Sequence, residues 1–172
     1  MTDTGSYREL SPDQLSAHVF KLIGQDWMLI TAGDEEDFNT MTASWGGLGF
    51  LWGRPVSFIF VRPQRYTFEF TERLSHYTLS FFNETYRDAL NYCGTHSGRD
   101  VDKVARTGLT PVVGKTGAVY FAEARLVLEC KTLYGQDLVE ESFWEHEICE
   151  QAYRAGDYHR MYVGEVVRIL QR

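Results

Sequence analysis

The feature that most constrains the fold is a set of short segments in which apolar residues alternate with polar ones. Within 77–81, Tyr77, Leu79 and Phe81 are separated by small polar residues, so an extended chain places them on one face. The same alternation predicts two further strands, with the inward residues Ala124, Leu126, Leu128 and Cys130 in one and Met161, Val163, Val167 and Ile169 in the other. Two continuous apolar runs, Trp27–Thr31 and Val56–Val61, are typical of interior strands. We therefore expect a fold rich in β-structure.

Helical spacing is confined to two short stretches between these strands. They are marked by the apolar sets Tyr66, Phe70, Leu74 and Tyr86, Ala89, Leu90, Cys93. The order of strands and helices lacks the regular alternation of a doubly wound sheet, and no G-x-G-x-x-G motif follows a strand. We therefore predict a mainly β fold, in which an antiparallel strand barrel closes on itself and helices pack around its outside.

Length and composition favour one domain over residues 1–172. The 172 residues, 44% of them hydrophobic, are enough to form one hydrophobic core but too few to make two independent domains expected. The first ten residues are expected to be loose. No run reaches the ~18 apolar residues of a membrane span, and the start of the chain lacks an apolar signal core. The three cysteines, Cys93, Cys130 and Cys149, form no C-x-x-C pair, which favours reduced thiols. We expect a cytoplasmic protein that does not enter the membrane.

The net charge of −7 comes mainly from two acidic segments. Asp34–Asp37 contains four acids, and Asp137–Glu150 contains six acids without Lys or Arg. This distribution argues against nucleic acid as the main partner, because phosphate-backbone binding requires a basic face. The interval Arg54–Arg73 differs, because it contains four basic residues and only two acids, Glu69 and Glu72. This local excess of positive charge suits a single phosphate group.

The segment Asn39–Gly47, NTMTASWGG, concentrates an amide, hydroxyls and an indole before two glycines. In an extended chain, Asn39, Met41, Ala43 and Trp45 lie on one face, and Thr40, Thr42 and Ser44 lie on the other. A flavin needs hydrogen-bonding groups for its pyrimidine edge, an apolar surface for its dimethylbenzene side, and donors for its ribityl and phosphate oxygens. The segment offers all three. A Thr-rich strand that runs into a Gly-Gly turn is the structural alternative.

The segment Arg62–Thr67, RPQRYT, lies between a predicted strand and a predicted helix. Its arginines and backbone amides would converge at a helix N-terminus, where unpaired N–H groups and the helix dipole favour a phosphate dianion. Arginine adds bidentate contacts to such a group. A surface turn with solvated arginines is the alternative.

Together these segments resemble the family of flavin reductase-like proteins with an FMN-binding split barrel, which includes flavoredoxins and the reductase components of two-component monooxygenases. The resemblance extends over roughly residues 25–170. It is carried by NTMTASWGG at 39–47, GRPVSFIFVRPQRYTFEF at 53–70, YTLSFF at 77–82, LNYCGTHSGRDVDK at 90–103 and DYHRMYVGEV at 157–166. It implies a split antiparallel β-barrel, FMN as cofactor, and a homodimer with the flavin near the subunit interface.

The resemblance also implies a cofactor site in three parts. The strand that lines the isoalloxazine and ribityl groups contributes Asn39, Thr40, Met41, Thr42, Ser44 and Trp45. The turn that holds the phosphate contributes Arg62, Arg65, Tyr66 and Thr67, and the loop that closes over the cofactor contributes Ser97, Gly98 and Lys103.

Two histidines have alternative interpretations. His159, in Asp157-Tyr158-His159, either faces the flavin or a nicotinamide, or starts a strand and pairs with an acid. His146 lacks the H-E-x-x-H spacing of a zinc site, so we expect it in a solvated acidic turn and predict no metal site.

Hydride transfer from a nicotinamide to a flavin needs no protein nucleophile, so no catalytic side chain is predicted. We expect an FMN-binding oxidoreductase that passes electrons from NAD(P)H through bound flavin to a flavin, a metal complex or a protein acceptor. One alternative is a flavoredoxin-like electron-transfer protein that is reduced by a protein partner. In that case a basic redox partner would dock on the acidic segment Asp137–Glu150. The other is a non-enzymatic module that binds FMN or haem.

Overall fold

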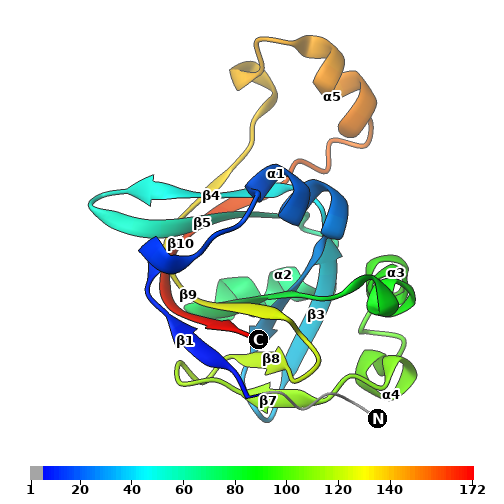
Figure 1. The fold of residues 1–172 in the computed structure, drawn as a ribbon. Helices are drawn as coiled ribbons and strands as arrows, with labels where there is room; N and C mark the ends of the chain where they lie inside the picture. Colours follow the sequence, from blue (N-terminus) through cyan, green and yellow to red (C-terminus); the bar gives the residue numbers. More distant parts are fainter. Residues whose placement is uncertain (1–5) are drawn as a thin grey trace.

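The computed structural model describes residues 6–172, and one curved antiparallel sheet dominates it (Figure 1). The strands of this sheet are β1 (Arg8–Leu10), β2 (Met28–Gly33), β3 (Phe38–Ala43), β4 (Gly46–Leu51), β5 (Arg54–Val61), β6 (His76–Phe81), β9 (Leu126–Asp137) and β10 (Arg160–Gln171). A separate hairpin consists of β7 (Pro111–Val113) and β8 (Val119–Phe121). The mainly β fold is thus confirmed.

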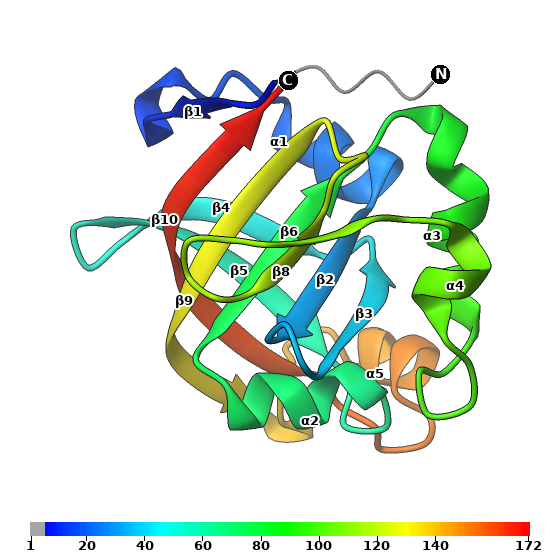
Figure 2. The ribbon, with the colours of Figure 1, turned by 90° about the horizontal axis from the view of Figure 1, so that it is seen from below.

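The strands follow the order β3-β2-β6-β9-β10-β5-β4, with β1 paired to β10 beside this path (Figure 2). β3 and β4 lie at the two ends of the path although only Ser44 and Trp45 separate them in the chain. Within residues 6–172 no ladder of hydrogen bonds joins β3 to β4. The sheet therefore curls into an antiparallel barrel that is split between these two strands, whereas the closed ladder expected from the sequence does not form.

Apolar side chains that alternate along the strands fill the interior of the barrel. Leu79 of β6 pairs with Ile30 of β2 on one side and with Leu128 of β9 on the other. Tyr77 and Phe81 point the same way as Leu79 and belong to the same buried cluster. The strand predicted from the alternation at 77–81 is thus confirmed, and so is its inward face.

The inward face predicted for the last strand is partly wrong. Val166 pairs with Cys130 and Arg168 pairs with Glu129, so Val167 is an extra residue in the ladder and is 45% exposed. This β-bulge, and a second register shift after Val163, change which residues point inward. The interior side chains are Tyr162, Val166 and Ile169. On β9 the predicted face holds from Leu126, while Ala124 precedes the strand and packs in a second cluster.

That second cluster lies between the outer face of the sheet and the peripheral elements. It joins Leu29 of β2 and Val127 of β9 to Leu90, Cys93 and Phe121.

The helices are α1 (Val19–Lys21), α2 (Tyr66–Arg73), α3 (Arg87–Thr95), α4 (Lys103–Thr107) and α5 (His146–Ala152), with short 3-10 helices at Pro12–Gln14, Glu84–Tyr86 and Glu140–Ser142 and a π-helical turn at Leu22–Asp26. The two predicted helices are therefore present as α2 and α3, although α2 ends one residue before Leu74. None of the helices in the described part of the chain has the length and hydropathy needed to span a bilayer.

Three local expectations do not hold. Residues 1–5 of the predicted loose start lie outside the described residues, whereas Arg8–Leu10 form β1 against the end of β10. Gly46 and Gly47 begin strand β4 and do not form a turn. A Cβ atom at Gly46 would lie 2.7 Å from the carbonyl oxygen of Phe58, so glycine allows this close approach to β5. His146 is the first residue of α5.

α5 belongs to the excursion, residues 138–159 between β9 and β10, which projects from one end of the barrel (Figure 1). The excursion leaves the sheet after Asp137 and returns at His159, whose carbonyl oxygen accepts a hydrogen bond from the backbone N–H of Leu138. It therefore ends beside the start of β10, next to the last residues of β5.

Candidate functional site

Two openings lie along β3 and share its residues as a wall. The first, called the His159 groove, has a volume of about 220 Å³ and is lined by Met41, Thr42, Ala43, Ser44, Trp45, Phe60, Arg62, Arg65 and His159. The second, called the Lys103 hollow, has a volume of about 430 Å³ and is lined by Glu36, Asp37, Phe38, Asn39, Thr40, Tyr66, Gly98, Val101, Asp102, Lys103, Val104 and Pro111. Because Arg65 lines the groove and the next residue lines the hollow, the two openings are neighbours.

The structure divides the sequence-predicted residues between these openings. The groove receives Met41, Thr42, Ser44, Trp45, Arg62, Arg65 and His159. The hollow receives Asn39, Thr40, Tyr66, Gly98 and Lys103. Thr67 and Ser97 line neither opening. Thr67 is buried under the hollow, where its hydroxyl accepts a hydrogen bond from the side-chain amide of Asn39 at 2.7 Å.

The end of α3 lies over β3 where the two openings meet, and two cations hold it there. The ammonium group of Lys103 donates to the carbonyl oxygens of Thr40 at 2.7 Å and Cys93 at 3.0 Å. The guanidinium group of Arg65 donates to the carbonyl oxygens of Gly94 at 2.8 Å and Cys93 at 3.3 Å. Two positive charges from distant parts of the chain therefore share one acceptor oxygen.

These two cations have no anionic partner among residues 6–172, since all their bonds are to neutral carbonyl groups. Burial lowers the pKa of Lys103 to about 8, and the charge of Arg65 acts in the same direction. Burial also lowers the pKa of Arg65. The thiol of Cys93 does not compensate these charges, because burial raises its pKa to about 11 and keeps it neutral. Desolvated cations without counter-charge are costly, and an anion placed between them would offset that cost.

The N-terminus of α2 and the side chain of Asn39 border the same region. The helix begins at Tyr66, and Arg65 at its N-cap position supplies no side-chain acceptor for the first turn. A Cβ atom at Gly98 would lie 1.9 Å from the amide oxygen of Asn39, so only glycine lets that loop pack there. Thr67 and Gly98 thus fix the Asn39 amide from two sides.

His159 forms the opposite end of the groove. Its ring centre lies 5.2 Å from that of Trp45 and 6.5 Å from that of Phe60. Its Nδ1 atom lies 2.8 Å from the hydroxyl of Tyr153, so the hydrogen-bond partner is a tyrosine and not the acid considered in the sequence-based alternative. Burial lowers the pKa of His159 to about 4, with the charge of Arg62 adding to the effect, and the imidazole is neutral at physiological pH.

The two arginines of the RPQRYT turn have different environments. Arg62 forms an ion pair with Asp157, donates to the carbonyl oxygen of Ala152 at 2.8 Å, and lies 5.3 Å from the ring centre of Tyr153. It therefore fastens the end of the excursion to the barrel, and its charge is compensated. Arg65 keeps its charge uncompensated.

Sequence reasoning missed several contributors to the site. The carbonyl groups of Cys93 and Gly94 are backbone atoms, which leave no side-chain signal. Tyr153 and Phe60 are aromatic residues like many others in the chain. The pairing of β10 with β5 brings Phe60 to His159, and the fold of the excursion brings Tyr153 there. The one available sequence signal is Asp157 in Asp157-Tyr158-His159. Its negative charge could have predicted the ion pair with Arg62 that brings this segment to the groove.

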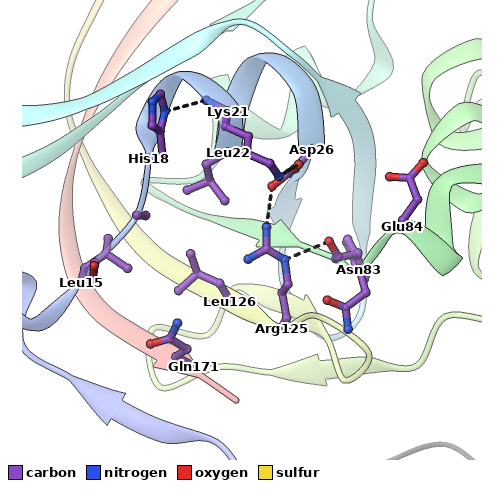
Figure 3. A pocket seen from close by; sticks show the side chains of 13 residues that line it. Leu15, His18, Lys21, Leu22, Asp26, Asn83, Glu84, Arg125, Leu126 and Gln171 are labelled. Carbon is purple, nitrogen blue, oxygen red and sulfur yellow. Dashed lines mark hydrogen bonds and ion pairs between the residues drawn. The ribbon is translucent and has the colours of Figure 1, made fainter.

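A third hollow, of about 440 Å³, shows what a compensated set of charges looks like (Figure 3). It lies between the α1 region and the start of β9. There the carboxylate of Asp26 accepts from Lys21 at 2.5 Å and from Arg125 at 2.8 Å. Both cations are paired within the chain, so this hollow lacks the charge imbalance seen at β3.

Comparisons with known proteins agree with this fold. An FMN-binding protein from Thermus thermophilus, solved with 1-cyclohex-2-enone, is 25% identical at a TM-score of 0.67, over 96% of this chain and 79% of that chain. The flavoredoxin of Desulfovibrio vulgaris (Miyazaki F) is 22% identical at a TM-score of 0.66, over 93% and 75% of the two chains. The NADH:FAD oxidoreductase SgcE6 of Streptomyces globisporus C-1027 is 20% identical at a TM-score of 0.64, over 86% and 75%. No curated protein matches the chain significantly.

A comparison with models of protein families also matches most of the chain. The model of the flavin reductase like domain matches residues 20–172. This match begins within α1 and includes every residue of the His159 groove and the Lys103 hollow. The chain therefore belongs to the family of flavin reductase-like domains.

Proposed function

We propose that the chain binds FMN along β3 and acts as an oxidoreductase through it. The observation that carries this proposal is the pair of desolvated cations beside the polar strand β3, Arg65 and Lys103, which bond to no carboxylate in the described part of the chain. Membership of the flavin reductase-like family supports a flavin as the ligand. The similar protein from Thermus thermophilus is an FMN-binding protein, which supports FMN in particular.

The residues present suit each part of this cofactor. Arg65 and Lys103 would provide charge for the phosphate, together with the N-terminus of α2 and the neighbouring Asn39, Thr40, Tyr66 and Gly98. Thr67 and Ser97 would support this site from behind, Thr67 by holding the Asn39 amide and Ser97 by accepting from the backbone N–H of Arg99. The groove would hold the ring system with apolar walls from Met41, Trp45 and Phe60 and with hydrogen-bonding groups from Thr42, Ser44, Arg62 and His159.

When bound, FMN supplies the ability to take a hydride from a reduced nicotinamide and to pass its electrons on to an acceptor. The chain contributes binding, orientation and polarity. Trp45 and Phe60 form an aromatic wall beside His159, and the neutral imidazole of His159 provides a hydrogen-bonding group without adding charge. We infer NADH or NADPH as the electron donor, and a flavin, a metal complex or a protein as the acceptor.

Anaerobic titration of the FMN-loaded protein with NADH and with NADPH tests the proposal. Loss of the visible flavin absorbance at one equivalent of nicotinamide is the expected result, with free FMN at the same concentration as the control. Reduction by dithionite but by neither nicotinamide would contradict nicotinamide-dependent activity and leave FMN binding intact. An absorbance spectrum typical of haem in the purified protein would contradict the choice of cofactor.

A flavoredoxin-like role is the second candidate, and the charge of the excursion favours it. The excursion contains six acids and one arginine, and Trp144 in this stretch is 97% exposed. Such a surface beside the His159 groove suits a basic redox partner. Slow reduction by either nicotinamide, together with fast partner-dependent reduction that falls steeply with salt, would favour this role.

We also propose that the chain forms a homodimer in the cytoplasm. An apolar hollow of about 630 Å³ adjoins the groove and is lined by His18, Val19, Phe20, Ile23, Gly24, Ser44, Trp45, Gly46, Gly47 and Leu48. Phe20 is 85% exposed and Trp45 is 51% exposed, which supports burial against another subunit. Three free cysteines support a reducing compartment. A monomer mass in sedimentation velocity would contradict the dimer.

A further inference from the structure

Tyr153 of the excursion is the closest polar neighbour of the histidine in the groove. Its hydroxyl lies 2.8 Å from Nδ1 of His159, and the two residues are only 6% and 8% exposed. The ring of Tyr153 stacks on Tyr158 at 4.8 Å and packs against Phe143 at 5.8 Å, while the guanidinium group of Arg62 lies 5.3 Å from its centre. The hydroxyl is therefore held in place by contacts on several sides of the ring.

The direction of this hydrogen bond follows from the chemistry of the two groups. A phenol O–H is a stronger acid than a neutral imidazole N–H, and an imidazole nitrogen is a better acceptor than a phenol oxygen. Within residues 6–172 the Tyr153 hydroxyl has no other acceptor. It therefore donates to Nδ1, and a neutral His159 must carry its proton on Nε2.

The second ring nitrogen of His159 is open to the groove. Within residues 6–172 no group forms a hydrogen bond with Nε2, and Nε2 is not among the buried side-chain atoms that lack a hydrogen bond there. Nε2 is thus neither paired nor sealed in the protein interior. The opening that His159 lines is the groove formed with Trp45 and Phe60.

We propose that Tyr153 is a positioning residue, which fixes His159 in the Nε2–H tautomer and so presents the groove with a neutral hydrogen-bond donor. The ligand group that suits this donor is an uncharged carbonyl oxygen, because an anionic group would bind the charged guanidinium of Arg65 in the same groove more strongly than a neutral imidazole. The identity of that carbonyl rests on the proposed function, whereas the tautomer does not.

The tautomer can be measured by ¹⁵N–¹H NMR on the protein without any cofactor, with the His159 signals assigned from His159→Gln. In the wild type we expect Nδ1 to resonate as an unprotonated nitrogen and Nε2 as a protonated one. Tyr153→Phe keeps the aromatic packing but removes the donor, so both resonances should shift toward the average of the two tautomers. Tyr158→Phe is the matched control and should leave both signals unchanged.

A protonated Nδ1 in the wild type would overturn the proposal, and so would unchanged His159 signals in Tyr153→Phe. If Tyr153→Phe does not fold, the wild-type spectrum still decides, because it reports directly which nitrogen carries the proton. These outcomes are independent of flavin binding, so they are distinguishable from a failure of the proposed function.

Two further additions identify the source of the carbonyl group. A shift of the Nε2 resonance on addition of FMN alone would assign it to the isoalloxazine ring. A shift that appears only when NAD⁺ or NADP⁺ is added to the FMN-loaded protein would assign it to the nicotinamide carboxamide. An Nε2 resonance that neither addition moves would overturn the role of His159 as a donor to the ligand.

Discussion

Lys103→Met would have opposite effects on FMN binding and on the stability of the protein without FMN. Methionine is similar in length to lysine but carries no charge. If Lys103 donates a hydrogen bond to the phosphate, its removal should cost about 1.5–3 kcal/mol of binding free energy, the range for a hydrogen bond to a charged group. This corresponds to a roughly 10- to 150-fold weaker Kd, since each 1.4 kcal/mol is tenfold.

The same substitution removes a buried charge from the protein without FMN. The pKa of Lys103 falls from 10.5 to about 8, a difference of about 2.5 units, so keeping this ammonium group charged at neutral pH costs on the order of 3 kcal/mol. Methionine avoids that cost but removes the Lys103 hydrogen bonds to the carbonyl oxygens of Thr40 and Cys93, at roughly 0.5–1.5 kcal/mol each, although Cys93 keeps the hydrogen bond from Arg65. The variant should therefore be as stable as the wild type or more stable, by up to ~2 kcal/mol.

Flavin fluorescence titration gives the Kd, and urea unfolding of the protein without FMN gives the free energy of unfolding. Lys131→Met, at an exposed position on β9, is the matched control for the change in net charge, and it should alter neither quantity. A wild-type Kd in Lys103→Met would show that the phosphate lies elsewhere. A loss of several kcal/mol of stability would refute the view that Lys103 is an uncompensated charge.

The remaining predictions concern pH and the opposite end of the groove. FMN affinity of the wild type should fall as pH rises above about 8, where the unliganded Lys103 loses its proton, and Kd measured from pH 7 to 10 should be flatter in Lys103→Met. His159 has a folded pKa of about 4, lowered from 6.5, so the unfolded state binds more protons between these values and stability falls as pH drops from 6.5 to 4. That loss should be on the order of 3 kcal/mol in urea unfolding and absent in His159→Phe, and an equal loss in the variant would refute it. Arg62→Ala should destabilise the protein by about 1.5–3 kcal/mol, because its charged hydrogen bonds hold the excursion, and it should weaken FMN binding less than Lys103→Met does.

Strands whose alternation is unbroken were predictable from local sequence, and strands with irregular pairing were not. The apolar positions in 77–81 stay in phase along all of β6, so both the strand and its inward face follow from the sequence. In β10 the bulge at Val167 depends on pairing with β9, which a local pattern does not contain. β4 was missed because Gly46, Gly47 and Gly49 reduce its apolar signal, although they belong to a strand.

The site shows a similar division between local and distant information. The types of residue in RPQRYT indicate an anion site from sequence alone, whereas Ser97, Gly98 and Lys103 were expected only from the family resemblance. Whether a given cation is available depends on which acid reaches it in the fold. Arg62 and Arg65 are three residues apart in one motif, yet within residues 6–172 only Arg62 meets a carboxylate, that of Asp157 at the far end of the excursion.

This difference explains how an acidic protein keeps a positively charged site. The net charge of −7 is concentrated in the excursion and in Asp34–Asp37, and from these segments only Asp157 reaches the arginines of the groove. Asp37 lines the Lys103 hollow but pairs with Arg73 at 2.7 Å, so it does not neutralise Lys103. Asp102 also lines the hollow, but its carboxylate accepts from the backbone N–H of Ala105 and caps α4. Among residues 6–172, Arg65 and Lys103 are thus bonded to carbonyl oxygens and not to these acids. Because a charge left unpaired in a buried place lowers stability, these two residues are better accounted for by a ligand they bind than by the folding of the chain itself.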